Sequence, residues 1–183
     1  ENRQIHLFEN IFHSVRNNVG DDFPVLSKVH LGEFMVMGHP YPANYQAALW
    51  MQDLGVDALE FGMGIFENAS ITFAKGKLPV NMVDDHIGPF MRFYWKMTAW
   101  TYKPLSGFKK PYFQTVARQL KKRGMTIPLL LAGGVRRYNE AAAILDEGTA
   151  DLIGMARPLL RDPNLPNKWM QGNKDDSLCI SCN

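Results

Sequence analysis

Residues 124–154 read GMTIPLLLAGGVRRYNEAAAILDEGTADLIG, and this stretch decides the fold class. Its apolar runs at Ile127–Leu131 and Asp151–Gly154 have the length and the glycine-bounded character of buried strands. Between them, Asn139–Glu147 has helical apolar spacing and is followed by Gly148. The order strand, helix, strand with short joints predicts two parallel strands connected by a crossover helix.

The same alternation extends upstream of this stretch. The remaining predicted elements are a helix with apolar residues recurring from Ile5 to Val19, a strand at Phe23–Leu31, a helix at Ala43–Leu54, a strand at Val56–Phe61 and a helix at about Tyr112–Lys122. Gly55 follows the second of these helices and suits a left-handed cap. Four strands alternating with helices therefore predict a parallel α/β sheet.

A barrel and an open doubly wound sheet both satisfy this pattern. No Gly-x-Gly-x-x-Gly turn follows any of the strands, and this favours the barrel. Four units are half of a (β/α)8 TIM barrel, so we expect a single domain over residues 1–183, corresponding to strands 5 to 8, with the other units upstream of Glu1. A long βα loop insertion at about 62–111 is rich in aromatic residues, which either form a lid or pack against the barrel rim.

Composition restricts the function classes. The chain has 183 residues, of which 46% are hydrophobic and 21% charged, and a formal net charge of +2 without a long basic run. We therefore expect a globular, cytoplasmic protein that acts on a small molecule and binds neither nucleic acid nor a membrane. A homo-oligomer is compatible with this composition.

Two strand ends carry residues suited to phosphate. Gly133 and Gly134 follow one predicted strand, and Arg157 follows the next. Glycines allow backbone N–H groups to approach phosphate oxygens, and arginine offers a bidentate donor. Each feature alone would fit a tight turn or a surface ion pair, but the loops after the last two strands are the common phosphate site of barrels. The combination predicts phosphate binding.

The run from Leu130 to Asn167 resembles the C-terminal part of the Old Yellow Enzyme family of NADH:flavin oxidoreductases. The motifs that carry the resemblance are Ala-Gly-Gly-Val, Asp-Leu-Ile-Gly-Met-Ala-Arg-Pro-Leu-Leu and Arg-Asp-Pro-Asn-Leu-Pro-Asn. It continues backwards through Gly-Val-Asp-Ala-Leu-Glu to Glu1-Asn2-Arg3, which is similar to the end of the family's Gly-Gly-Ser-x-Glu-Asn-Arg segment. The resemblance covers nearly the whole chain except the long insertion.

The resemblance implies an FMN-dependent enzyme that takes hydride from NAD(P)H and reduces activated C=C bonds. Its flavin phosphate would be bound by Gly133, Gly134, Ala156 and Arg157, and Lys28 would lie at the flavin N1/O2 edge. Ala156 departs from the family's usual glycine, and its methyl group is compatible with a right-handed backbone.

Strand alternation places Lys28 and Glu60 on corresponding faces of neighbouring strands, so the two side chains are predicted to pair. The pair would be either a structural ion pair or a group that tunes the flavin, because buried charges need partners in both cases.

Cys179 and Cys182 form a Cys-x-x-Cys-Asn sequence. It resembles the start of the cluster motif in family members that carry a [4Fe-4S] centre, while a zinc pair or free thiols are the alternatives. The family's substrate-activating pair and proton-donor tyrosine lie upstream of the Glu-Asn-Arg segment. We therefore assign no catalytic residue to this chain and expect it to be inactive alone.

Two other functions stay open at this point. One is a non-catalytic half-barrel that binds a phosphorylated ligand and completes its barrel as a dimer. The other is a different phosphate-binding TIM-barrel enzyme, such as an isomerase or aldolase, since one fold serves many reactions.

Overall fold

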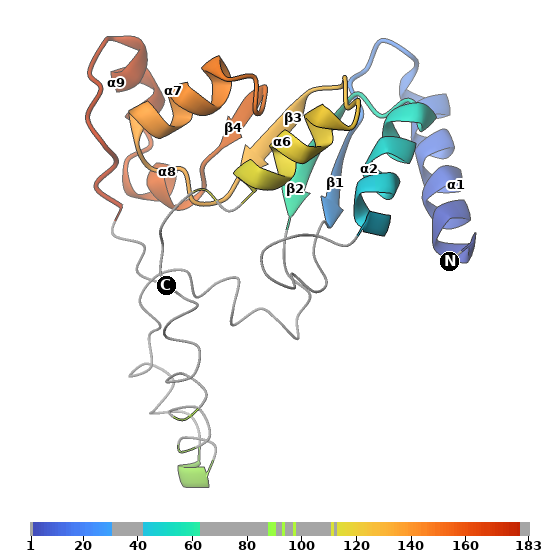
Figure 1. Ribbon diagram of the computed structural model, residues 1–183, viewed down its shortest axis with the longest axis horizontal. Coiled ribbons are helices and arrows are strands. Elements are labelled where there is room, and N and C mark those ends of the chain that lie inside the picture. The colour runs from blue at the N-terminus through green and yellow to red at the C-terminus, as the bar shows by residue number, and fades with distance from the viewer. Residues whose placement is uncertain are drawn as a thin grey trace.

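The computed structural model describes residues 2–30, 42–62, 88–90, 93, 97, 111 and 113–179. The elements are α1 (Asn2–Val19), β1 (Leu26–His30), α2 (Pro42–Leu54), β2 (Ala58–Gly62), α6 (Gln114–Lys122), β3 (Leu129–Ala132), α7 (Tyr138–Asp146), β4 (Leu152–Gly154), α8 (Arg157–Arg161) and α9 (Leu165–Met170). Among the described residues, strands and helices alternate as far as β4, and two short helices follow (Figure 1).

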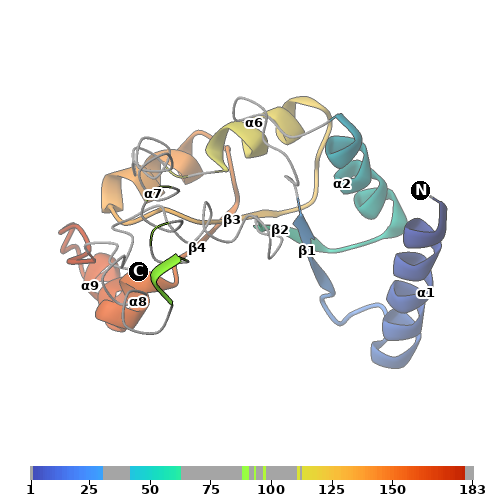
Figure 2. The same cartoon turned by 90° about the horizontal axis from the view of Figure 1, so that it is seen from below.

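The four strands form one parallel sheet in the order β1-β2-β3-β4. Neighbours in the sheet are also consecutive strands of the described chain, an order that is compatible with crossover connections through helices. Figure 2 shows α2, α6 and α7 along one side of the sheet, with α1 beyond β1. The predicted parallel α/β sheet is therefore confirmed.

Alternation along the strands separates the two faces of the sheet. Leu59 and Phe61 on β2 and Leu129 and Leu131 on β3 are almost completely buried, and they belong to the core cluster with side chains of α6 and α7. The intervening residues of β3 are only partly buried and face the other side. One face is therefore the core of the helix-covered layer, and the opposite face is available for a site.

Each predicted strand and helix is present with shifted ends. The strand predicted at Ile127–Leu131 begins later, at Leu129, because Pro128 has no N–H to donate to a ladder. The helices α8 and α9 were not predicted. They have five and six residues, too few for a periodic apolar pattern to be visible.

Gly55 ends α2 in the predicted left-handed conformation, with φ of +99°. Its N–H donates to the carbonyl of Gln52, and the next N–H, of Val56, donates to the carbonyl of Met51. These bonds satisfy carbonyls that the helix end leaves without partners. The turn directs the chain into β2.

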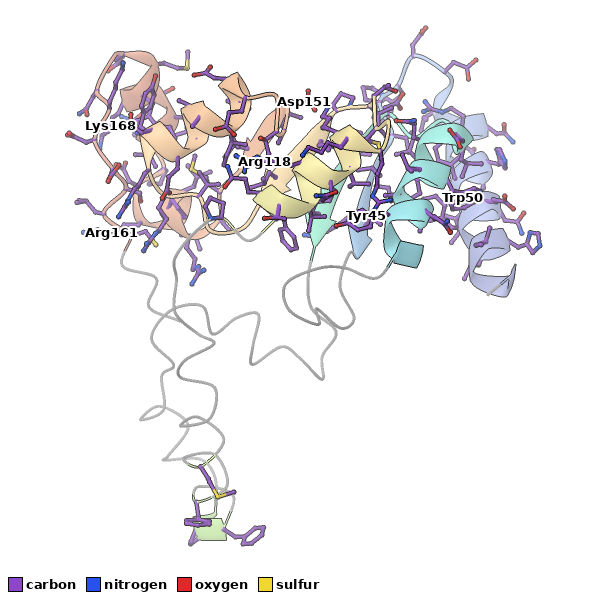
Figure 3. All side chains as sticks on the ribbon, in the orientation of Figure 1. Tyr45, Trp50, Arg118, Asp151, Arg161 and Lys168 are labelled. Carbon is purple, nitrogen blue, oxygen red and sulfur yellow. The ribbon has the colours of Figure 1, made fainter. Side chains whose placement is uncertain are left out.

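Two aspartates, two βα units apart, make equivalent contacts at the starts of their strands. Asp57 precedes β2, and its Oδ2 accepts the N–H of Val25 at 2.6 Å and Arg16 Nη2 of α1 at 2.6 Å. Asp151 precedes β4 in the same way. Its Oδ2 accepts the N–H of Leu129 at 2.8 Å and Lys121 Nζ of α6 at 2.7 Å, at the end of the sheet where the strands begin (Figure 3). Each aspartate therefore joins two strands and a helix.

The hydrogen bond from the Val25 N–H, followed by that from Arg16, holds the pKa of Asp57 below its usual value. Burial of Asp151 raises its pKa, but the bonds from Lys121 and the Leu129 N–H outweigh this, and the pKa is also lowered. Both carboxylates are therefore stabilised in their charged form by the folded chain.

We expect Asp57→Asn and Asp151→Asn each to lower the free energy of unfolding at pH 7 by about 1–2 kcal/mol, since the side chain keeps its shape but loses its charge at a half-exposed position. A folded-state pKa below the unfolded value of about 4 stabilises the protein above that pH. The contribution is lost as the pH falls through the folded pKa. Urea unfolding at pH 7 and pH 3 should show a deficit that shrinks at pH 3, with Asp53→Asn as the control, because Asp53 is an exposed residue of α2. An equal deficit at both pH values would contradict this account.

Among the described helices, none is long and apolar enough to cross a membrane.

Candidate phosphate and flavin site

A cleft of about 460 Å³ lies at the ends of β2, β3 and β4. Its lining includes Gly133, Gly134, Ala156 and Arg157. These are the residues of two separate loops that the sequence predicts to bind phosphate. The cleft lies on the carboxyl side of parallel strands, where α/β proteins build their sites because the loops to the helices converge there. The structure thus brings four of the predicted site residues together.

The glycine turn follows β3 directly. Gly133 has φ of +116° and Gly134 has φ of +90°, so both adopt backbone conformations that side chains rarely tolerate. The chain then enters α7 at Tyr138. This turn exposes backbone to the cleft without a Cβ in the way, which is the requirement for close approach of an anion.

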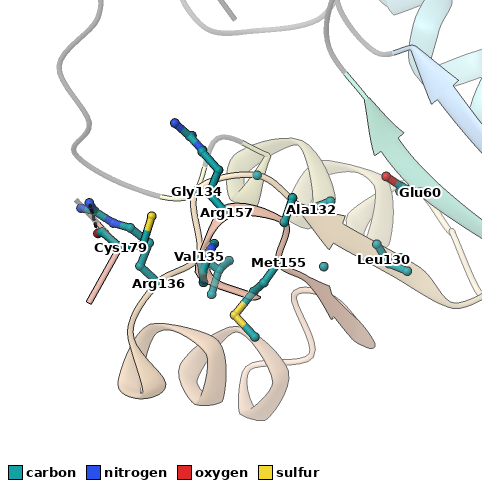
Figure 4. A pocket seen from close by; sticks show the side chains of 13 residues that line it. Glu60, Leu130, Ala132, Gly134, Val135, Arg136, Met155, Arg157 and Cys179 are labelled. Atoms are coloured by element: carbon teal, nitrogen blue, oxygen red, sulfur yellow. Dashed lines mark hydrogen bonds between the residues drawn. The ribbon is translucent and has the colours of Figure 1, made fainter. Parts of the chain in front are cut away.

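Ala156 and Arg157 form the adjoining wall of the cleft. Ala156 caps α8 with φ of −93° and ψ of −71°, a right-handed conformation that is compatible with its methyl group. Arg157 is the first residue of α8, and its side chain extends from the wall beside the glycine turn (Figure 4). A guanidinium there can form a bidentate contact with a phosphate.

Glu60 on β2 lines the cleft at the end opposite Arg136 and Cys179 (Figure 4). It pairs with Lys28 of β1, whose Nζ lies 2.8 Å from Glu60 Oε1, and the two residues are register partners in the sheet. The predicted ion pair is therefore confirmed. The Lys28 side chain is 64% exposed. Lys28 is not among the described residues that line the cleft, and it is connected to the cleft through its ion pair with Glu60.

Sequence reasoning did not anticipate that Arg136 and Cys179 line this cleft. Cys179 is the first cysteine of the predicted metal-binding motif, and the second, Cys182, lies outside the described residues. Almost all of the predicted insertion at 62–111 also lies outside them. Within the part of the chain that the structure describes, no three His, Cys, Asp or Glu side chains are grouped to hold a metal ion. No local sequence pattern could have revealed that Cys179 adjoins the glycine turn.

These features define a class: a parallel α/β protein with a glycine-lined cleft formed by two successive βα loops. Residues 99–176 match the model of the NADH:flavin oxidoreductase / NADH oxidase family. The chain is 29% identical over 178 residues to a 4,4'-dithiodibutanoate disulfide reductase of Rhodococcus erythropolis, covering 94% of this chain and 43% of that protein. It is 26% identical over 174 residues to an NADH oxidase of Thermoanaerobacter brockii, covering 94% and 22% respectively.

The fold is similar to that of a 2-naphthoyl-CoA reductase solved with 2-naphthoyl-CoA, with a TM-score of 0.68 and 22% identity over 97% of this chain and 23% of that one. The chain is thus similar to the NADH:flavin oxidoreductase / NADH oxidase family over residues 99–176, and its similarity to two reductase and oxidase relatives covers 94% of its length. It spans less than half the length of these relatives.

Proposed function

We propose that this chain is the cofactor-binding part of an FMN-dependent NAD(P)H oxidoreductase that reduces activated C=C bonds. The observation that carries the proposal is the cleft, which gathers Gly133, Gly134, Ala156 and Arg157 from the loops after β3 and β4. The family match supports a flavin and NADH as the redox partners. The C=C acceptor follows the Old Yellow Enzyme resemblance, while the relatives' names include a disulfide reductase.

The residues of the cleft fit the flavin phosphate. The positive-φ turn at Gly133 and Gly134 leaves room for phosphate oxygens at the backbone, and Arg157 supplies the counter-charge. Lys28, held by Glu60 on the neighbouring strand, would stabilise negative charge at the N1 edge of the ring. Bound FMN would supply the chemistry by accepting a hydride and passing it to the acceptor.

The decisive experiment is a titration of the chain with FMN and with riboflavin, followed by flavin fluorescence, and with inorganic phosphate, followed by calorimetry. We expect FMN to bind more tightly than riboflavin, because only FMN carries the phosphate. If the chain binds inorganic phosphate as tightly as FMN, the flavin ring adds nothing to binding. That result would favour a non-catalytic phosphate-binding half-barrel or another phosphate-binding barrel enzyme, and it would overturn the flavin proposal.

We also propose that the sheet is the C-terminal half of a (β/α)8 barrel. The face opposite the helices bears Leu26 on β1, 52% exposed, and Leu152 on β4, 46% exposed. In a closed barrel, such inward side chains pack in layers and the edges of β1 and β4 pair with further strands. The chain alone should therefore self-associate in sedimentation experiments. A stable monomer at high concentration would contradict this.

The ion pair beside the cleft predicts that two substitutions shift the reduction potential of bound flavin in opposite directions. Lys28→Met should lower the reduction potential of bound flavin, because it removes a cation that favours the reduced, anionic form. Glu60→Gln should raise it. We expect shifts on the order of 30 mV, or about 1.4 kcal/mol for a two-electron couple, limited by solvent screening at the exposed amine. Potentials that move in the same direction, or stay constant, would remove the pair from the site.

A further inference from the structure

The chain after α9 returns to the glycine turn and is fixed along the way. Trp169 Nε1 donates to the carbonyl of Asp175 at 2.9 Å, and the ring of Trp169 packs edge-on against Tyr138 with centroids 5.6 Å apart. Lys174 Nζ lies 5.3 Å from the centroid of the Tyr138 ring. Residues 173–179, the return segment, therefore lie against the first residue of α7.

Arg136 joins this return segment to the cleft. Its carbonyl accepts the N–H of Ser177 at 2.9 Å, and its Nη1 lies 3.5 Å from the carbonyl oxygen of Cys179 (Figure 4). Arg137 adds an exposed ion pair to Asp176 at 3.5 Å. Both Arg136 and Cys179 line the cleft, so the end of the segment is part of the cleft wall.

We propose that Arg136 is a positioning residue that couples docking of the return segment to binding of the phosphorylated cofactor in the cleft. This inference rests on the proposed flavin site and adds a device by which that site is preorganised. Arg136 is separated from Gly134 by a single residue, so its contacts restrain the loop that contains Gly133 and Gly134, and glycines lose more conformational freedom than other residues when they are ordered.

The coupling has a thermodynamic reason. A ligand that needs the glycine turn in one conformation binds less tightly when the turn must first be ordered, and a docked segment removes part of that cost. Linkage then requires the converse, that the bound ligand stabilises the docked segment by the same factor. A purely structural segment would show neither effect.

Two measurements test the proposal: FMN affinity, and amide hydrogen exchange of residues 177–179 with and without FMN. We expect FMN to slow this exchange. Arg136→Ala should weaken FMN binding about fivefold, the lower end of ordinary coupling between sites, and abolish the protection. Arg136→Lys, which keeps a donor, should restore part of both.

Trp169→Phe separates coupling from direct contact with the ligand. Trp169 is not among the described residues that line the cleft. Phenylalanine at this position keeps an aromatic ring but lacks the N–H that donates to the carbonyl of Asp175. We expect FMN affinity to fall in this variant too. Trp50→Phe is the matched control, because Trp50 packs on Phe8 of α1 at the other end of the sheet.

Unchanged FMN affinity in Trp169→Phe, or exchange at residues 177–179 that FMN does not alter, would overturn the coupling while leaving the flavin site intact. Failure of the unaltered chain to bind FMN would overturn the proposed function and this inference together.

Discussion

Replacing Arg157 by alanine is expected to weaken FMN binding about 10- to 150-fold, equivalent to about 1.5–3 kcal/mol for a hydrogen-bonded charge. Arg157 opens α8 and lines the cleft beside the glycine turn. A phosphate dianion loses a bidentate partner when the guanidinium is removed, and neighbouring backbone groups cannot replace its full charge. Riboflavin affinity should change little, because riboflavin has no phosphate.

Arg161→Ala is the matched control, since Arg161 ends the same helix, is exposed and is not among the cleft residues that the structure describes. It removes the same formal charge from the same element. Equal losses in the two variants would mean that Arg157 acts only through general electrostatics. A loss of riboflavin affinity as large as that of FMN would place Arg157 away from the phosphate.

The alternation of elements could be predicted because each one is marked locally. The core strands combine short apolar runs with glycine before or after them, as in Val56–Phe61, and the helices have apolar residues at helical spacing. The short helices α8 and α9 lack a full period of such spacing. The sequence does not define the strand ends to the residue, because they depend on which N–H groups find partners on neighbouring strands.

The gathering of Gly133, Gly134, Ala156 and Arg157 could be predicted because the carboxyl ends of parallel strands share one edge of the sheet. The position of Arg136 in the cleft could not be predicted from the sequence. It depends on residues 173–179 returning from α9, which no local pattern encodes. The roles of Asp57 and Asp151 could not be predicted either, because their bonds to the N–H groups of Val25 and Leu129 exist only in the folded chain.

Gly154→Ala should destabilise the fold by about 1–3 kcal/mol, the usual cost of overpacking a tight site. A Cβ at Gly154 would lie 2.8 Å from the Cβ of Ala132 and 3.0 Å from Leu130 Cδ2. The Leu130 side chain can rotate, but the Cβ of Ala132 is fixed to the backbone of β3. Gly154 and Ala132 are register partners, so the added methyl group forces β4 away from β3 at the cleft.

The double variant Ala132→Gly/Gly154→Ala tests whether this one contact is the cause. Removing the Ala132 Cβ should recover part of the loss, reduced by about 0.5–1 kcal/mol because glycine is unfavourable within a strand. Gly88→Ala is the control, since a Cβ at Gly88 would meet no atom within 4 Å. Free energies from urea unfolding of the parent and the variants give the coupling directly. If the two substitutions are simply additive, the destabilisation does not arise from the approach of β4 to β3, and the close packing of these strands beside the cleft would need another explanation.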